Sequence, residues 1–225
     1  MSLRRKDYAG AALAVVLAAL CVRLGFWQLH RLHERRARNA GVAAARALPP
    51  IDLPAVGVAV ESLAERRVRA TGVYDWAHEH VWHARTYQGA PGVTLVTPLR
   101  LADGSWLLVD RGWAPSADAY HVDGAHFREA DTALVAGLAE RAPRDRGDAD
   151  PRRLADSLGG AVLPVVAQLL PGDANARLPL GLVRWPAPEL DEGPHLSYTV
   201  QWFSFAVIIL VGTFALLRKQ AREGH

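Results

Sequence analysis

Apolar residues are concentrated in two long runs, one near each end of the chain. Residues 9–29 read AGAALAVVLAALCVRLGFWQL, and residues 198–217 are similarly apolar. Each run has about the 20 residues that a helix needs to cross a hydrocarbon core of about 30 Å. Pro194 suits the first turn of a helix, so the second helix is predicted to begin at His195. The pattern predicts transmembrane helices over residues 9–29 and 195–217.

A cleaved signal peptide is the alternative interpretation of the first run, since Arg4, Arg5 and Lys6 precede it. No A-x-A site follows the apolar core closely, and the helical pattern continues through QLHRLHERRARNA. We therefore expect an uncleaved anchor. Residues 30–54 are expected to form a helical extension and then, over residues 40–54, a linker rich in Ala and Pro.

Between the runs, apolar and polar residues alternate as in β-strands. Strands are predicted in RRVRATGVYDW, VWHARTYQG and TALVAGLAER. GVTLVTPLRLADGSWLLVDRGWAP predicts a hairpin that turns at Asp103 and Gly104. AVLPVVAQLL predicts a strand near a sheet edge, because Pro164 interrupts it. GLVRWPAPEL predicts a last strand.

Two segments of the middle region do not have the strand pattern. Pro151 predicts the start of a short helix over residues 150–158. RAPRDRGDADPRR, residues 141–153, predicts a charged loop. The fold class we expect is therefore an α+β membrane protein, in which two transmembrane helices flank a small β-rich, largely antiparallel extracytoplasmic domain over residues 55–194.

Basic residues lie at both ends of the chain, in the tails formed by residues 1–8 and 218–225. Lys and Arg are enriched in cytoplasmic segments, so both termini are predicted to be cytoplasmic and the domain periplasmic or otherwise extracytoplasmic. Four arginines beyond the first span oppose this assignment, but long loops are translocated largely regardless of charge. They are Arg31, Arg35, Arg36 and Arg38.

Composition excludes several functions. The net charge is only +3, and no basic stripe interleaved with aromatics points to nucleic acid. Cys21 is the only cysteine, so the chain has neither an internal disulfide nor a thiolate metal site. Met1 is the only methionine, which argues against copper delivery through soft sulfur ligands. No hydrolase, metalloprotease, Walker or Rossmann motif occurs, so we expect no enzyme.

Two histidine-containing segments are candidates for ligand binding. His78 and His80 would share one face of a strand while His83 points to the other, which is a poor arrangement for one metal ion and favours a polar turn. On the second predicted span, His195, Tyr198 and Trp202 share one helical face. An imidazole there can ligate haem iron, and Arg23 or Arg31 can pair with propionates. The residues alone favour an interfacial histidine within an aromatic belt.

Four sequence blocks occur in a characteristic order: LGFWQLHR, GVYDW with the later segment 85–99, WLLVDRGWAP and HLSYTVQWFSFA. Together they resemble the surfeit locus protein 1 family of cytochrome c oxidase assembly factors. The resemblance covers nearly the whole chain, including both spans. Residues 141–160 and the HEHVWH segment match nothing in the family pattern.

The resemblance implies a non-enzymatic role in the maturation of haem-copper oxidase, with transient binding of haem a and help in its insertion into subunit I. The family's proposed haem ligand corresponds to His195, the axial ligand of the haem iron in this hypothesis. The alternative is a protein-only membrane scaffold that stabilises a subunit I assembly intermediate without haem; a membrane oxidoreductase would need a second redox partner or a substrate pocket. Further residues within the matching blocks are Trp27, Gln28, Arg31, Gly72, Tyr198, Gln201 and Trp202, of which Trp27, Gln28, Arg31, Tyr198 and Trp202 are expected to contact haem.

The partners that the resemblance implies are oxidase subunit I, haem a synthase and other assembly factors. They would be met in the membrane, and nucleic acid is not expected. The chain begins only a few residues before its first span, whereas a mitochondrial member would carry a presequence there. We therefore expect a multi-pass protein of the bacterial cytoplasmic (inner) membrane.

Overall fold

The computed structural model describes residues 5–55, 60–142, 151–172 and 178–223 of the 225. The chain forms two compact units, one of residues 1–41 with 190–225 and one of residues 42–189. Each unit is described by itself.

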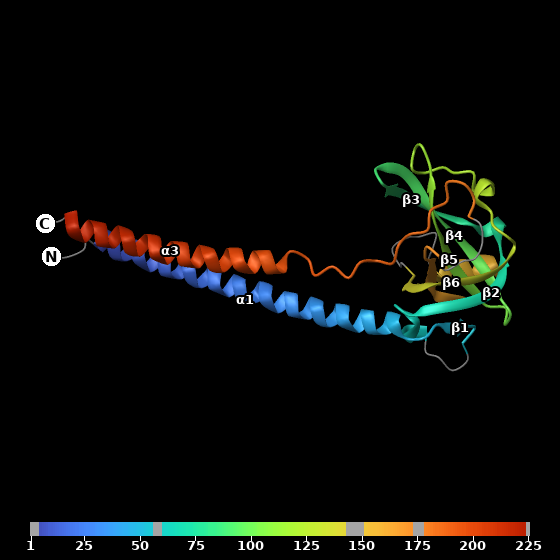
Figure 1. The fold of residues 1–225 in the computed structure, drawn as a ribbon, viewed down its shortest axis with the longest axis horizontal. Helices are drawn as coiled ribbons and strands as arrows, with labels where there is room; N and C mark the ends of the chain where they lie inside the picture. The colour runs from blue at the N-terminus through green and yellow to red at the C-terminus, as the bar shows by residue number, and fades with distance from the viewer. Residues whose placement is uncertain (1–4, 56–59, 143–150, 173–177, 224–225) are drawn as a thin grey trace. The chain divides into compact units, whose positions relative to one another are not determined.

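The first unit contains α3 (His195–Glu223) and all but the last turns of the long helix α1 (Arg5–Ala47), and the two helices lie side by side (Figure 1). Small buried residues line their contact: Ala18, Cys21 and Ala206. A Cβ on Gly25 would lie 2.6 Å from the Phe203 ring, so a larger residue here would displace that ring. Small residues at such a contact let two membrane helices approach closely.

Most of the remaining apolar surface of α1 and α3 is exposed. Only 17% and 6% of the most apolar windows of these helices are buried. A helix in the core of a soluble protein would be largely buried, whereas a membrane helix exposes its apolar side chains to lipid. The chain is therefore a membrane protein with two apolar helices, as its sequence predicts.

Helix α1 extends well beyond its predicted span. It continues to Ala47, and strand β1 (Ile51–Leu53) begins four residues later. The linker predicted over residues 40–54 is therefore wrong for most of its length. Alanine has the highest helix propensity, so the Ala-rich segment continues the helix instead of breaking it.

The second unit is built on a closed sheet. The strands are β2 (Arg67–Tyr74), β3 (His80–Tyr87), β4 (Ala90–Leu101), β5 (Trp106–Pro115), β6 (Thr132–Arg141) and β7 (Val162–Leu169). Their order is β1-β2-β6-β7-β5-β4-β3, and an additional β2–β4 pairing closes five of them into a barrel. Among the named strands that the structure describes, β1–β2 and β5–β7 are the parallel pairs, so the sheet is largely antiparallel, as predicted.

Alternating side chains of the barrel strands form its core. Strand β2 buries Val68, Ala70 and Tyr74 while its other residues are more exposed. Gly72 lies where β2 pairs with both β4 and β6, and a Cβ there would lie 2.3 Å from the carbonyl oxygen of Arg100. The glycine of the GVYDW block therefore allows the barrel to close.

The predicted hairpin turn is confirmed at Asp103 and Gly104. Gly104 has a φ of 84°, and the backbone N–H of Ser105 donates to Oδ1 of Asp103 over 2.9 Å. Short helical segments cover parts of the barrel: η1 (Val60–Leu63), η2 (Trp76–His78), η3 (Gly124–Phe127) and α2 (Pro151–Leu158). Helix α2 begins at the predicted proline, while residues 143–150 of the charged loop lie outside the described residues.

Two strand predictions are wrong. Strand β7 lies between β5 and β6 rather than near an edge. Its proline is tolerated there because Pro164 falls where the β5–β7 register shifts, at a position that needs no backbone N–H donor. GLVRWPAPEL forms one isolated bridge, between Trp113 and Val183. Its prolines, Pro186 and Pro188, have no backbone N–H with which to continue a ladder.

Candidate functional site

His195 begins α3 and is oriented by a residue on α1. Its Nδ1 lies 2.8 Å from Oε1 of Gln28. An amide oxygen can only accept, so Nδ1 is the donor, and in the neutral tautomer with this proton Nε2 keeps its lone pair. No hydrogen bond to Nε2 is found among the residues that the structure describes. A histidine whose second nitrogen is held in this way is typical of metal ligation.

Local hydrogen bonds define the start of α3. The carbonyl of Pro194 accepts from the backbone N–H of Tyr198 at 3.1 Å and from the hydroxyl of Ser197 at 2.8 Å. Gly193 has a φ of 70°, a conformation that favours glycine, and its N–H donates to Asp191. The chain therefore turns into the helix at His195.

The segment just before α3 is tied to α1 by what we call the clasp: Arg35, Arg36, Asn39, Asp191 and Glu192. Arg36 donates two hydrogen bonds of 2.9 Å to the two carboxylate oxygens of Glu192. Arg35 and Asn39 donate to the backbone carbonyl of Asp191 at 2.8 and 3.0 Å. The hydrogen bond from Arg36 holds the pKa of Glu192 below its usual range. These contacts set where His195 lies along α1.

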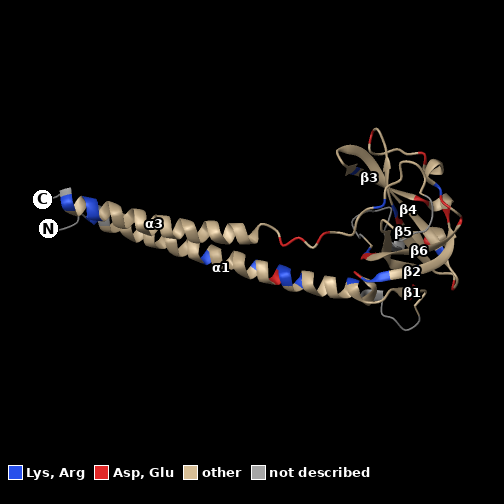
Figure 2. Cartoon of the chain, viewed as in Figure 1, with Lys and Arg blue, Asp and Glu red and all other residues tan. Residues whose placement is uncertain are grey.

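A cavity of ≈ 230 Å³ lies beside His195. We call it the cationic cavity. Three arginines and one glutamate of α1 complete its lining, so its charge is positive (Figure 2 marks the basic positions). The other α1 residues lie three, four and seven positions after the first one, so all four share one helical face. They are Arg31, Glu34, Arg35 and Arg38.

The three arginines differ in their partners. Arg31 forms an ion pair of 2.7 Å with Glu34, which also lies 3.2 Å from His30. Arg35 is held by the clasp. Arg38 is exposed and has no hydrogen bond or ion pair among the described residues.

The aromatic candidates lie apart from the cavity lining. Trp27 and Tyr198 are 53% and 44% exposed. Trp202 is half-buried, packs with Ala18 and Ala206 at the contact of α1 and α3, and meets the Phe205 ring edge-on at 5.9 Å. The structure therefore brings His195, Gln28 and Arg31 together but leaves the three aromatic rings outside the lining.

Two other residues of the predicted site are exposed. Arg23, the alternative to Arg31, does not line the cavity, and Gln201 lies on the exposed surface of α3. The sequence analysis missed Glu34, Arg35 and Arg38, although their spacing from Arg31 would have placed them on its face. No such signal could have found the clasp, because its partners lie more than 150 positions apart in the chain.

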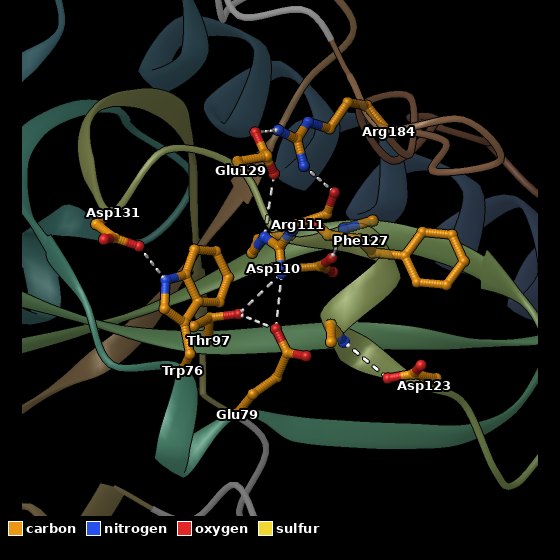
Figure 3. Close-up of polar contacts among 12 residues, drawn as sticks. Trp76, Glu79, Thr97, Asp110, Arg111, Asp123, Phe127, Glu129, Asp131 and Arg184 are labelled. Carbon is orange, nitrogen blue, oxygen red and sulfur yellow. Dashed lines mark hydrogen bonds and ion pairs between the residues drawn. The ribbon is translucent and has the colours of Figure 1, made fainter.

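The barrel contains a separate buried charge cluster (Figure 3). The fully buried Arg111 donates to Glu79 at 2.7 Å, to Glu129 at 3.0 Å and to the carbonyl of Phe127. Its guanidinium lies 4.6 Å from the ring centroid of Trp76. Arg184 donates to Glu129 at 2.6 Å and to the carbonyl of Arg111. The two arginines balance the two glutamates, so this cluster holds the loops around β5 together.

Asp110 precedes Arg111 at a bulge of β5. The register with β4 shifts there, and Gly112 has a φ of 112°. The backbone N–H of Gly112 donates to Asp110 at 2.8 Å. Burial, opposed by this hydrogen bond, raises the pKa of Asp110 to about 7.

The HEHVWH segment does not form a single strand. His78 lies in η2, with its Nδ1 2.8 Å from Asp75, whereas His80 begins β3. The expectation that they share one strand face is therefore wrong. His83 packs against the ring of Tyr120, with centroids 5.4 Å apart. Among the described residues, no three His, Cys, Asp or Glu side chains are grouped to hold a metal ion.

Comparison with known proteins identifies the family. The family model described as SURF1 family matches residues 15–207, which include most of the first apolar run, the whole barrel and the first half of the second apolar run. The chain belongs to the SURF1 family. This confirms the resemblance drawn from the four sequence blocks. Membership implies a role in cytochrome c oxidase assembly, because the family consists of assembly factors and is not a known class of enzyme.

Of three SURF1-like proteins, two are similar to this chain over most of its length and the third over less than half. An uncharacterized SURF1-like protein of Mycobacterium tuberculosis is 28% identical over 234 residues, covering 94% of this chain and 86% of the relative. A SURF1-like protein of Monosiga brevicollis is 26% identical, with 87% and 83% covered. A SURF1-like protein of Rickettsia felis is 31% identical over 101 residues, with 44% and 43% covered.

Proposed function

We propose that this SURF1-family protein binds haem a transiently through His195 and aids its insertion into subunit I of cytochrome c oxidase. The observation that carries the proposal is the 2.8 Å hydrogen bond between His195 and Gln28. It leaves Nε2 as a basic nitrogen beside a cationic cavity. Both features suit a ligand that has a metal ion and acidic groups.

The donor set fits haem. Neutral imidazole is a common axial ligand of haem iron, and the amide oxygen of Gln28 fixes its tautomer and ring orientation. When bound, haem a supplies the iron centre that the mature oxidase uses for electron transfer. Arginine guanidinium groups bind carboxylates with paired hydrogen bonds, so Arg31 suits a propionate.

Different residues of the first unit have different roles in holding such a group. Gln28 orients the imidazole, and the clasp fixes the position of His195 along α1. Trp27 and Tyr198 offer exposed aromatic surface within one helical turn of Gln28 and His195, respectively. Trp202, about 10 Å further along α3 from His195, packs between the helices and supports their contact. A single nitrogen ligand is consistent with a carrier that must release its cargo.

The proposed function also requires a membrane location and protein partners. Both termini carry basic residues, which supports a cytoplasmic location for both and an extracytoplasmic location for the barrel. We infer that the protein resides in a bacterial cytoplasmic membrane, where oxidase subunit I, haem a synthase and other assembly factors are its partners. The barrel offers the larger folded surface for such contacts.

The test is an absorption spectrum of the detergent-purified protein from cells that make haem a. We expect a Soret band and an a-type α band in the wild type, both weakened in His195→Ala. Circular dichroism should show that the barrel of the variant remains folded. A colourless wild type that still co-purifies with subunit I, before and after the substitution, would support the protein-only scaffold instead.

A further inference from the structure

The cationic cavity has a chemistry that the histidine alone does not explain. We propose that it is a carboxylate-binding subsite in which Arg31 and Arg38 bind the propionates of the haem that His195 ligates. This inference rests on the proposed function and names the groups that give the site its affinity for a dianionic ligand. In this arrangement the residue that ligates the metal is on α3, and the arginines that bind the carboxylates are on α1.

The charge of the cavity is the first support. Arg31 and Arg35 lie four residues apart on α1 and Arg38 three further, so three like charges are neighbours on one face. Glu34 pairs with Arg31 at 2.7 Å and is the acidic residue in the lining. Such a cluster repels itself until an anion neutralises it.

The partners of the three arginines decide which of them are available. Arg35 is committed, because it donates to the carbonyl of Asp191 at 2.8 Å and holds the segment before His195. Arg38 is exposed and forms no hydrogen bond or ion pair within the described part of the chain. Arg31 can exchange Glu34 for a ligand, since this ion pair is about half exposed. Arg38 is therefore the principal anion-binding residue and Arg31 the second.

The size of the cavity suits the ends of a ligand rather than its body. At ≈ 230 Å³ it is smaller than the roughly 300–1,000 Å³ of pockets that enclose drug-sized molecules. It can accept short carboxylate chains while an apolar macrocycle remains outside it. Because His195 also lines the cavity, the residue that ligates the metal lies next to the arginines that bind the carboxylates.

The position of the arginines along α1 supports the same ligand. They follow the apolar window of the helix, at the level where its sequence becomes polar. Carboxylates bound there would stay at the membrane surface. The phosphate of an anionic lipid shares this chemistry, so the experiment must distinguish the two.

The experiment compares haem b with its uncharged dimethyl ester. Both compounds are titrated by absorption into the full-length protein in phosphatidylcholine nanodiscs, for the wild type, Arg38→Gln, Arg31→Gln and Arg218→Gln. Arg218→Gln removes the same charge from the exposed far end of α3. We expect the wild type to prefer the diacid about tenfold, since charge-assisted carboxylate bonds are at stake. Arg38→Gln and Arg31→Gln should each reduce this preference without changing the affinity for the ester.

Several results would overturn the inference. Equal affinity of the wild type for diacid and ester would show that the cavity does not bind propionates. Equal losses for both compounds in Arg38→Gln would show that the arginine only maintains the structure. Reduced retention of phosphatidylglycerol in Arg38→Gln, measured by native mass spectrometry with an unchanged diacid preference, would assign the cavity to lipid phosphate. A wild type that binds neither compound, and that is also colourless when purified from cells that make haem a, would overturn the proposed function and this subsite together.

Discussion

Nδ1 of His195 at the start of α3 is hydrogen-bonded to Oε1 of Gln28 on α1, although the two residues are 167 positions apart in the chain. The bond joins two helices that are separated in sequence by the whole barrel. It selects the imidazole tautomer with Nε2 available as a ligand. The consequences of this pairing, of the clasp and of the charged groups of the barrel can each be measured.

Gln28→Leu should weaken haem binding although it leaves His195 in place. Loss of a hydrogen-bonding partner of a metal-ligating histidine typically costs about 10- to 100-fold in affinity, because the ring is no longer held in one orientation. Gln28→Glu keeps an oxygen acceptor and should bind more tightly than Gln28→Leu. Absorption titration with haem b measures both. Equal affinities of Gln28→Leu and the wild type would show that Gln28 does not position the histidine.

Breaking the clasp should affect haem binding through the position of His195. Arg36→Glu and Glu192→Arg each place like charges opposite one another, so we expect each to lower the affinity for haem b. The double variant restores an opposite-charge pair and should recover most of the loss. Because the pair is exposed, the effect should shrink in high salt. Additive losses in the double variant would contradict a positional role for this pair.

The same pair should respond to acid. The hydrogen bond from Arg36 lowers the pKa of Glu192 in the folded protein. Its contribution is therefore present above the ordinary glutamate pKa and is lost as the pH falls through the lowered value. We expect the difference in haem affinity between the wild type and Glu192→Gln to be constant at neutral pH and to vanish only in more acidic solution. A difference that disappears already near pH 7 would exclude this ion pair as the cause.

Arg111→Met should destabilise the barrel strongly. It leaves Glu79 and Glu129, which are only 11% and 8% exposed, without one of their cationic partners. Breaking a buried ion pair by removing one side costs about 3–5 kcal/mol. The matched control is Arg69→Gln, which breaks an exposed pair with Asp52 and should cost less than about 1 kcal/mol. Thermal unfolding of the full chain in detergent compares them, and similar losses would mean that the buried cluster is not structurally important.

Asp110→Asn should change how stability depends on pH. Burial raises the pKa of Asp110 to about 7 in the folded protein, above the ordinary value of 3.8. The folded state therefore holds this proton more tightly, so the contribution is complete below about pH 4 and is lost as the pH rises through 7. Asparagine stays neutral and can still accept from Gly112.

We expect Asp110→Asn to gain stability relative to the wild type between pH 5 and 8 (roughly 1.4 kcal/mol for each unit of the pKa difference as an upper limit). Thermal melts at several pH values measure the difference. Glu140 lies in the same electrostatic environment and contributes to the raised pKa of Asp110, so Glu140→Gln should move the transition to lower pH. A pH-independent difference between the wild type and Asp110→Asn would show that Asp110 does not titrate in this range.

Local sequence determined the elements whose causes are local. The apolar runs around Cys21 and Ile208 are long enough to be membrane helices, and Asp103 with Gly104 provides the turn of the hairpin. Strands β2 and β6 follow from alternation within one segment. The order of the four sequence blocks was sufficient to indicate the family, which the match over residues 15–207 confirms.

Only the tertiary structure decided which distant residues meet. Pro164 suggested an edge, yet closure of the barrel placed β7 between two strands because a bulge accommodates the missing donor. His195 had a suitable helical face in sequence, but its bond to Gln28 depends on the packing of small residues such as Gly25 between α1 and α3. Periodicity predicts which face of an element is apolar, but it does not predict the register between elements. That register arises from side-chain packing and the hydrogen bonds of the whole fold.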